Sequence, residues 1–367
     1  MPALSLTKVM IPPDDNDRLD DSPEALKKNL INKMPVTRTT IWMIVIALAL
    51  TPCNAQKSKK MNDKDKNNPL LCDIETGMCE LPAAAEKDSV KQITVRDKPV
   101  KIIYFTDPIC SSCWGIEPQL RKLKLEYGND IDMEYRMGGL LPDWSYNSGG
   151  ISQPSDVAHH WDEVSRYYDM PIDGDVWLED PLASSYPPSI AFKAAQMQDP
   201  EKAIIFLRKL RELLFLQKKN ITKWEYVEQA AKYSGLDAAQ LKKDYEGEAP
   251  QRFSEDLELA RKLGVRGFPS IFFADQQGNT EFVYGSKPYP VYEGALLKLY
   301  PGAVKTDYAT SWEKLFEKYP TLTVKELAVL SGVQRAQAEA QLESLVKEGK
   351  LRKIITKNGS LYSIEEH

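Results

Sequence analysis

The chain has 367 residues, of which 42% are hydrophobic and 28% are charged. These fractions are ordinary for a soluble globular protein of about two domains, and they exclude collagen, low-complexity disorder and a protein with many membrane spans. The formal net charge of −5 argues against a general nucleic-acid binder, and five cysteines with only three histidines point to thiols as the main candidates for chemistry.

The N-terminal extension, residues 1–55, has the pattern of a targeting segment. Arg38 precedes an apolar run at 41–50, and Cys53 and Ala55 follow it. A positive flank, a short apolar core and a small residue before a cleavage point predict a secretory signal, and the run is too short to span a bilayer as a helix. We expect export to the periplasm or cell envelope, either by cleavage after Ala55 or with lipid anchoring through Cys53. If the apolar run is not a signal, we expect a cytoplasmic protein.

Residues 56–92 predict a flexible linker that contains one pair of cysteines. The lysine- and asparagine-rich sequence at 57–68 has almost no apolar residue. Cys72 and Cys79 then enclose a six-residue loop with Gly77 near its turn. Three roles stay open for this pair: a structural disulfide, which an exported protein can form, a second dithiol that relays electrons, or metal ligation.

The next domain, residues 93–303, alternates apolar β-rich runs with helical spacing. Strands are expected at 98–106, 131–137, 269–274 and 280–284, and helices at 111–127 and 289–300. A helical insert at about 150–263 separates the two halves, with helices expected at 200–218, 223–234, 238–245 and 251–263. Pro118 is expected to kink the first helix. The fold class is therefore α/β, a sheet with a helical insertion.

The C-terminal residues 311–367 predict a separate, winged-helix-like module. Two helices and a β hairpin are expected, at 323–330, 334–347 and 351–364. The second helix carries as many acidic as basic side chains, so it cannot neutralise phosphates. We expect this module to contact protein or to dock on the main domain, and we expect no nucleic-acid partner.

The motif Cys110-Ser111-Ser112-Cys113 directly follows a predicted strand and begins a helix. Only a thiolate attacks a disulfide, and the N–H groups at a helix N-terminus lower a thiol pKa. Cys110 is therefore the expected nucleophile, and Cys113, about one turn further on, is the expected resolving thiol. Zinc sites use the same spacing, but the sequence has no second such motif and the adjacent histidines lie far away. We expect no metal and no cofactor.

The segment 105–118, which contains this motif, resembles the thioredoxin-fold oxidoreductases of the DsbA-like group, which carry a helical insertion. Phe268-Pro269 matches the pair with a cis peptide bond that packs against the two cysteines in that fold. The resemblance implies that Phe268 and Pro269 dock an extended peptide, which pairs with the backbone of the residue before the proline. Trp114 and Trp144 are further candidates to line a substrate groove.

Three segments, 105–118, 137–142 and 184–195, resemble one particular branch of this group, the SpxH (YjbH) branch of the DsbA/FrnE-like proteins. Members of that branch are cytoplasmic adaptors that deliver a transcription factor to the ClpXP protease. The export signal departs from that branch, so dithiol chemistry is our main expectation: an enzyme that exchanges disulfides with protein or peptide substrates through a mixed disulfide, with an electron-donor or electron-acceptor protein as a partner. The alternative expectation is an adaptor that binds clients and delivers them to a protease.

Overall fold

A computed structural model describes residues 72–73, 78–80, 98–145 and 153–365. The predicted signal, with Cys53, and the polar linker at 57–68 lie outside these ranges, so export and the expected domain boundaries stay predictions. Within the described residues, no helix combines the length and apolar character that crossing a membrane requires.

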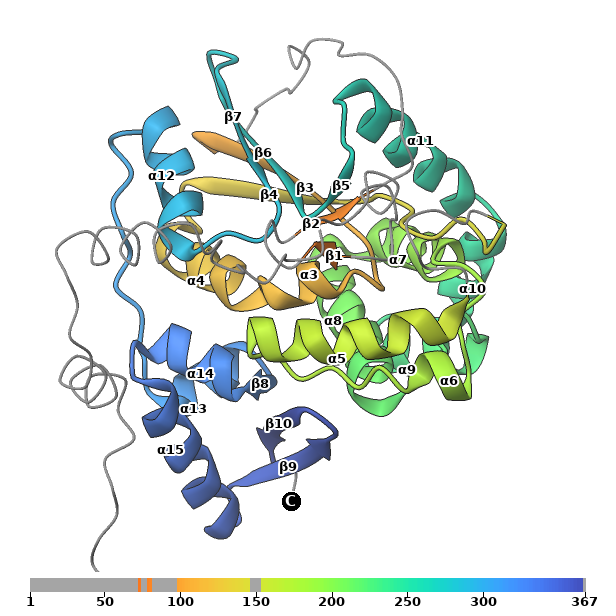
Figure 1. Cartoon of the computed structure of the whole chain (residues 1–367). Helices are drawn as coiled ribbons and strands as arrows, with labels where there is room; N and C mark the ends of the chain where they lie inside the picture. Colours follow the sequence, from red (N-terminus) through yellow and green to blue (C-terminus); the bar gives the residue numbers. More distant parts are fainter. Residues whose placement is uncertain (1–71, 74–77, 81–97, 146–152, 366–367) are drawn as a thin grey trace, which may run out of the picture. The chain divides into compact units, whose positions relative to one another are not determined.

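A four-stranded sheet in the order β4-β3-β6-β7 forms the centre of the main domain (Figure 1). Its strands are β3 (Val100–Thr106), β4 (Ile131–Met137), β6 (Ser270–Asp275) and β7 (Thr280–Tyr284). β3 runs parallel to β4 and antiparallel to β6, and β7 runs antiparallel to β6. The two inner strands are almost entirely buried, as expected for continuous apolar runs. All four strands lie within two residues of their predicted positions.

Helices of the main domain connect and cover this sheet. α4 (Glu117–Tyr127) makes the crossover that a parallel pair requires, and α12 (Tyr289–Leu299) packs against α4, β6 and β7. The helix expected at 111–127 is divided into α3 (Ser111–Gly115) and α4, with Ile116 between them. Pro118 lies in the first turn of α4, where its missing N–H costs no hydrogen bond, so the predicted kink is present as a break.

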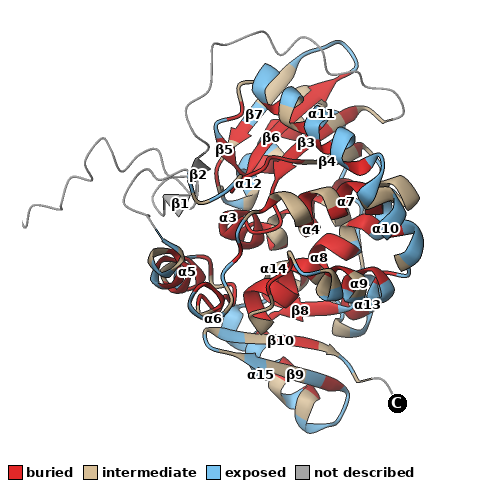
Figure 2. Cartoon of the chain, turned by 90° about the vertical axis from the view of Figure 1, so that its right-hand side faces the viewer, coloured by how far each residue is buried: buried red, intermediate tan, exposed pale blue. Residues whose placement is uncertain are grey.

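The helical insert lies between β4 and the second group of strands. Its helices are α5 (Pro154–Tyr168), α6 (Val176–Glu179), α7 (Tyr186–Gln198), α8 (Pro200–Gln217), α9 (Trp224–Tyr233), α10 (Ala238–Glu246) and α11 (Ala249–Lys262). α8 is buried over most of its surface and packs against α7 and α9 (Figure 2). The chain therefore has the predicted α/β fold, a thioredoxin fold with a DsbA-like helical insertion.

The C-terminal residues form the expected helices and hairpin, with two additional short elements. α14 (Val324–Ser331), α15 (Arg335–Lys347), β9 (Leu351–Thr356) and β10 (Gly359–Ile364) follow α13 (Trp312–Lys318) and β8 (Thr321–Thr323). The three strands pair in the order β8-β10-β9. The module has its own apolar core, and α14 packs against α4 of the main domain.

Candidate functional site

The two cysteines of the C-x-x-C motif lie at the junction of β3 and α3, where the sequence places them (Figure 1). Cys110 is the N-cap of α3, and its Sγ accepts a hydrogen bond of 3.1 Å from the backbone N–H of Cys113. The two residues form a disulfide, with Cα atoms 5.2 Å apart. Both residues are 0% exposed. A substrate thiolate therefore cannot reach either sulfur unless neighbouring groups move.

Trp114 is part of the core, which corrects the expectation that it lines a substrate groove. It is 0% exposed, and its Nε1 donates a hydrogen bond of 3.0 Å to the carbonyl of Pro171. The indole packs against Phe215 with ring centroids 5.6 Å apart, and the guanidinium of Arg208 lies 4.3 Å from the ring centroid. The side chain therefore holds α3 against the helical insert.

Trp144 is half-buried and fixed to the insert. Its Nε1 donates a hydrogen bond of 2.7 Å to the carbonyl of Leu182, and its ring meets Trp177 edge-on at 5.8 Å. Its role in substrate contact stays a prediction.

Asp107 is a site residue that sequence reasoning missed, although it lies only three positions before Cys110. The carboxylate is fully buried and accepts hydrogen bonds from the N–H groups of Ile109 (3.0 Å) and Leu140 (2.7 Å) and from the Ser185 hydroxyl (2.9 Å). Burial raises the pKa of Asp107 to about 6, although these donors oppose the shift. One carboxyl group thus ties the loop before the thiols to two other segments.

Arg211 connects α8 to the same loop. Its fully buried guanidinium forms an ion pair with Glu117 and donates hydrogen bonds to Thr106 Oγ1 (2.6 Å) and the Asp107 carbonyl (3.2 Å). The sequence holds no local signal for this contact, because six of the eighteen residues of α8 are charged, as in an amphipathic helix, although the structure buries most of its surface. Charged residues that are buried in this way must find partners inside the protein.

A second buried network, made of ion pairs and hydrogen bonds, joins α3 to the C-terminal module. Arg208, which lies over Trp114, donates two hydrogen bonds to the carboxylate of Glu326 on α14, at 2.7 and 3.0 Å. Arg121 of α4 lies 3.1 Å from the same carboxylate. Burial opposes ionisation of Glu326, but the two guanidinium groups outweigh it, so the pKa of this carboxyl is lowered. The module is thereby fixed to the main domain, as the docking alternative predicted.

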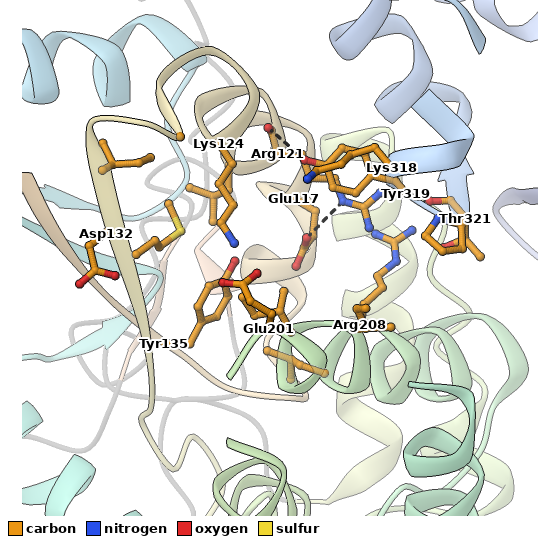
Figure 3. A pocket seen from close by; sticks show the side chains of 18 of the residues that line it. Glu117, Arg121, Lys124, Asp132, Tyr135, Glu201, Arg208, Lys318, Tyr319 and Thr321 are labelled. Carbon is orange, nitrogen blue, oxygen red and sulfur yellow. Dashed lines mark hydrogen bonds and ion pairs between the residues drawn. The ribbon is translucent and has the colours of Figure 1, made fainter. Parts of the chain in front are cut away.

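Figure 3 shows a cavity of about 620 Å³ between α4, β4, α8 and the segment that leads into β8. Side chains of both signs line it, among them Arg121, Lys124, Glu201 and Lys318. Burial lowers the pKa of Lys124, and the carboxylate of Glu201 opposes that shift without reversing it. Neither cysteine of the motif is among the lining residues. The cavity therefore belongs to the junction of the two modules and not to the thiol site.

The Phe268–Pro269 bond is cis, as predicted. Phe268 ends a two-residue strand, β5 (Gly267–Phe268), which the sequence did not indicate. Two further short strands, β1 (Cys72–Asp73) and β2 (Met78–Glu80), join it in a separate sheet in the order β1-β2-β5. Within this sheet Cys72 lies opposite Cys79 in an antiparallel pair of strands, here called the β1–β2 hairpin.

The residues that the structure describes contain no group of three or more His, Cys, Asp and Glu side chains placed to hold a metal ion.

Comparison with known proteins gives the family. The profile of a thioredoxin family matches residues 104–294. The ClpXP adapter protein SpxH of Halalkalibacterium halodurans is 35% identical to this chain over 301 residues, which cover 80% of this chain and 97% of that protein. The chain belongs to the SpxH family of thioredoxin-fold proteins.

Other SpxH proteins are similar over most of their length. The ClpXP adapter protein SpxH of Bacillus subtilis is 29% identical over 270 residues, covering 72% of this chain and 89% of that protein. Among solved structures, a putative protein disulfide isomerase from Nitrosomonas europaea covers 55% of this chain and 96% of its own, with 20% identity and a TM-score of 0.47. The cytosolic disulfide reductase DsbM from Pseudomonas aeruginosa covers 54% and 99%, with 20% identity and a TM-score of 0.45.

These relatives correct the main functional expectation. The SpxH proteins are named as adapters of a protease, not as protein-disulfide oxidoreductases, so the predicted enzyme class is wrong. The expected thiol or disulfide substrates and the electron-transfer partner are corrected with it. The burial of Cys110 and Cys113 is a physical reason for the difference, because disulfide exchange requires that a thiolate reach one of the sulfurs.

Proposed function

We propose that this protein is a protease adaptor, which binds a client protein and presents it to a ClpXP-type protease. The observation that carries the proposal is the match to the SpxH of Halalkalibacterium halodurans, which extends over 80% of this chain and 97% of that adapter. The similarity thus includes more than the thioredoxin domain that many proteins share.

Two features of the structure support a binding role. The disulfide between Cys110 and Cys113 is buried, so a substrate has no direct access to the most reactive motif of the chain. The C-terminal module contacts the main domain through the buried carboxylate of Glu326, which binds Arg208 and Arg121. Contacts of this kind suit an adaptor, because a surface that is organised before binding loses less entropy when a partner binds.

A degradation assay tests the proposal. The purified chain is added to ClpXP of the same organism, ATP and an extract of its proteins, and the decay of each protein is followed by quantitative mass spectrometry. We expect a small set of proteins to decay faster with the chain than without it, and the chain to bind the ClpX subunit. Reactions without ClpX control for other proteases. Unchanged decay of every protein, together with no binding to ClpX, would contradict the adaptor role.

The cellular location is part of the same proposal. An adaptor must share a compartment with its protease, whereas the apolar run at 41–50 predicts export. We propose that this protein, acting as an adaptor, stays in the cytoplasm. Cell fractionation with N-terminal sequencing tests this. Protein in the cytosolic fraction supports the proposal, whether its N-terminus includes residues 41–50 or begins after them. A mature chain found entirely in the envelope would contradict it.

A further inference from the structure

The backbone edge of β5, here called the docking edge, is filled by another part of the same chain. β2 pairs with β5 in antiparallel register, with Cys79 opposite Phe268 and Glu80 opposite Gly267. Figure 1 draws β1 and β2 next to β5, to which β2 is hydrogen-bonded. The position that the sequence predicts for an incoming extended peptide is thus occupied by residues about 190 positions earlier in the chain.

The docking edge offers backbone groups more than side chains. Phe268 is 0% exposed and its ring is directed into the protein, because a Cβ added at Gly138 would lie 1.7 Å from Phe268 Cζ. Gly267 has no side chain. A strand added here is therefore held mainly by main-chain hydrogen bonds, which recognise an extended conformation and place few demands on sequence.

The present occupant is small. Its strands contain two and three residues, and β2 meets β5 at two residue positions. A two-stranded hairpin of this size is at best marginally stable by itself, so it depends on the pairing with β5. A competing strand that makes the same main-chain hydrogen bonds and extends further can take its place.

We propose that the β1–β2 hairpin is an exchangeable cover of the docking edge, and that an extended segment of a client protein binds there by displacing β2. This inference rests on the proposed adaptor function and names the site and conformation of the client segment. The hairpin acts as an internal competitor, because the apparent affinity for a client falls with the fraction of molecules in which the edge is covered.

The test measures binding of a peptide to variants in which the cover is weakened. Cys79→Pro removes a backbone N–H from the middle of β2, and proline is excluded from central strands. Cys79→Ser is the matched control, since it removes the same thiol and keeps the backbone donor. A third variant lacks residues 70–82. The probe is a fluorescent synthetic peptide with the sequence of residues 70–82 and serine in place of both cysteines, and all proteins are otherwise full-length.

We expect the peptide to bind Cys79→Pro and the deletion variant roughly tenfold or more tightly than wild type and Cys79→Ser, because the edge is free only in the first two. Hydrogen exchange reports the edge directly. Successive amides of a strand point to opposite sides, so one of the amides of Gly267 and Phe268 faces β2. That amide should exchange slowly in wild type, faster in the two open variants, and slowly again when peptide is added.

Equal peptide binding by all four proteins would overturn the inference, as would fast exchange at both Gly267 and Phe268 in wild type. The deletion variant keeps the test valid if Cys79→Pro does not fold. None of these measurements involves the protease. A negative result here therefore leaves the adaptor proposal standing, and unchanged degradation in the protease assay leaves the result at the docking edge unaffected.

Discussion

Asp107 shows how one buried carboxyl group makes the loop before the thiols sensitive to pH. Burial raises its pKa from 3.8 to about 6, so the folded protein binds a proton at this group more tightly than the unfolded chain does. The resulting stabilisation is fully present below the unfolded pKa near 3.8. It is lost as the pH rises through about 6, where the buried group must ionise.

We expect the free energy of unfolding of the wild type to fall by about 2 kcal/mol, through Asp107 alone, between about pH 4 and pH 7. Asp107→Asn cannot titrate, so its stability should be less dependent on pH in this window, even though the amide satisfies fewer of the three donors. Urea denaturation at a series of pH values measures the difference. Asp132→Asn, at a half-exposed position, should follow the wild type. Parallel curves for wild type and Asp107→Asn would contradict the assignment.

Gly138 and Gly294 differ in the space that is available for a side chain. A Cβ at Gly138 would overlap the buried ring of Phe268, whereas a Cβ at Gly294, inside α12, would meet no atom within 4 Å. We expect Gly138→Ala to cost about 1–3 kcal/mol through overpacking. Gly294→Ala should stabilise the protein by up to ~1 kcal/mol, because alanine is the better helix former. Thermal and urea unfolding test both, and a Gly138→Ala variant as stable as wild type would show that Phe268 can move.

At the scale of elements, α8 connects three parts of the protein that are distant in sequence. Arg211 binds the end of β3, while Arg208 contacts both Trp114 on α3 and Glu326 on α14. Buried ion pairs contribute little net stability compared with apolar packing, but removing one partner leaves an uncompensated charge. The network therefore defines the position of the C-terminal module more than it stabilises the fold.

Glu326→Gln tests this network. The amide leaves the guanidinium groups of Arg208 and Arg121 without their shared counter-charge, so we expect a loss of about 3–5 kcal/mol in the free energy of unfolding. Glu339→Gln is the control, because it disrupts a pair with Arg335 in which both side chains are about half exposed, and it should cost less than about 0.5 kcal/mol. Similar losses in the two variants would show that Glu326 is not the link between the modules.

The strands that could be predicted are those with a long local pattern. β3 is a continuous apolar run that ends just before Pro108, and β4 and β7 are bounded by glycines, so their positions follow from neighbouring residues. β5 and β2 have two and three residues, too few for any period to appear. They exist because Cys79 meets Phe268, and a pairing between such distant residues leaves no local pattern in the sequence.

The residues of the candidate site also divide into those that a local sequence pattern predicts and those that it does not. The C-x-x-C motif and Phe268-Pro269 were predicted because their spacing and local chemistry are specific. Asp107 and Arg211 were not, since a charged residue next to a strand end or within a helix usually faces water. Their importance comes from burial and from partners in other segments, which only the folded chain shows.

At the scale of the whole molecule, the structure combines a redox motif with features that limit its use. The disulfide at the N-terminus of α3 is buried, the docking edge is filled by β2, and the C-terminal module is bound to α8, which packs on Trp114. Each of these features fixes a surface and none exposes a sulfur. An arrangement that keeps the thioredoxin fold but seals the sulfurs is better suited to holding a partner than to exchanging disulfides with it.

The double variant Cys110→Ser/Cys113→Ser distinguishes these two uses. Loss of a disulfide that closes so short a loop should cost only about 2 kcal/mol, so the variant should remain folded at moderate temperature. We expect the double variant to accelerate client decay by ClpXP as well as the wild type does, because the proposed adaptor role uses no reaction at the sulfurs. The two rates should agree within about twofold, which corresponds to less than about 0.5 kcal/mol. Circular dichroism and thermal unfolding, measured in parallel, confirm that both proteins are compared in the folded state. A folded double variant that no longer delivers clients would show that reversible chemistry at Cys110 is part of the adaptor's action.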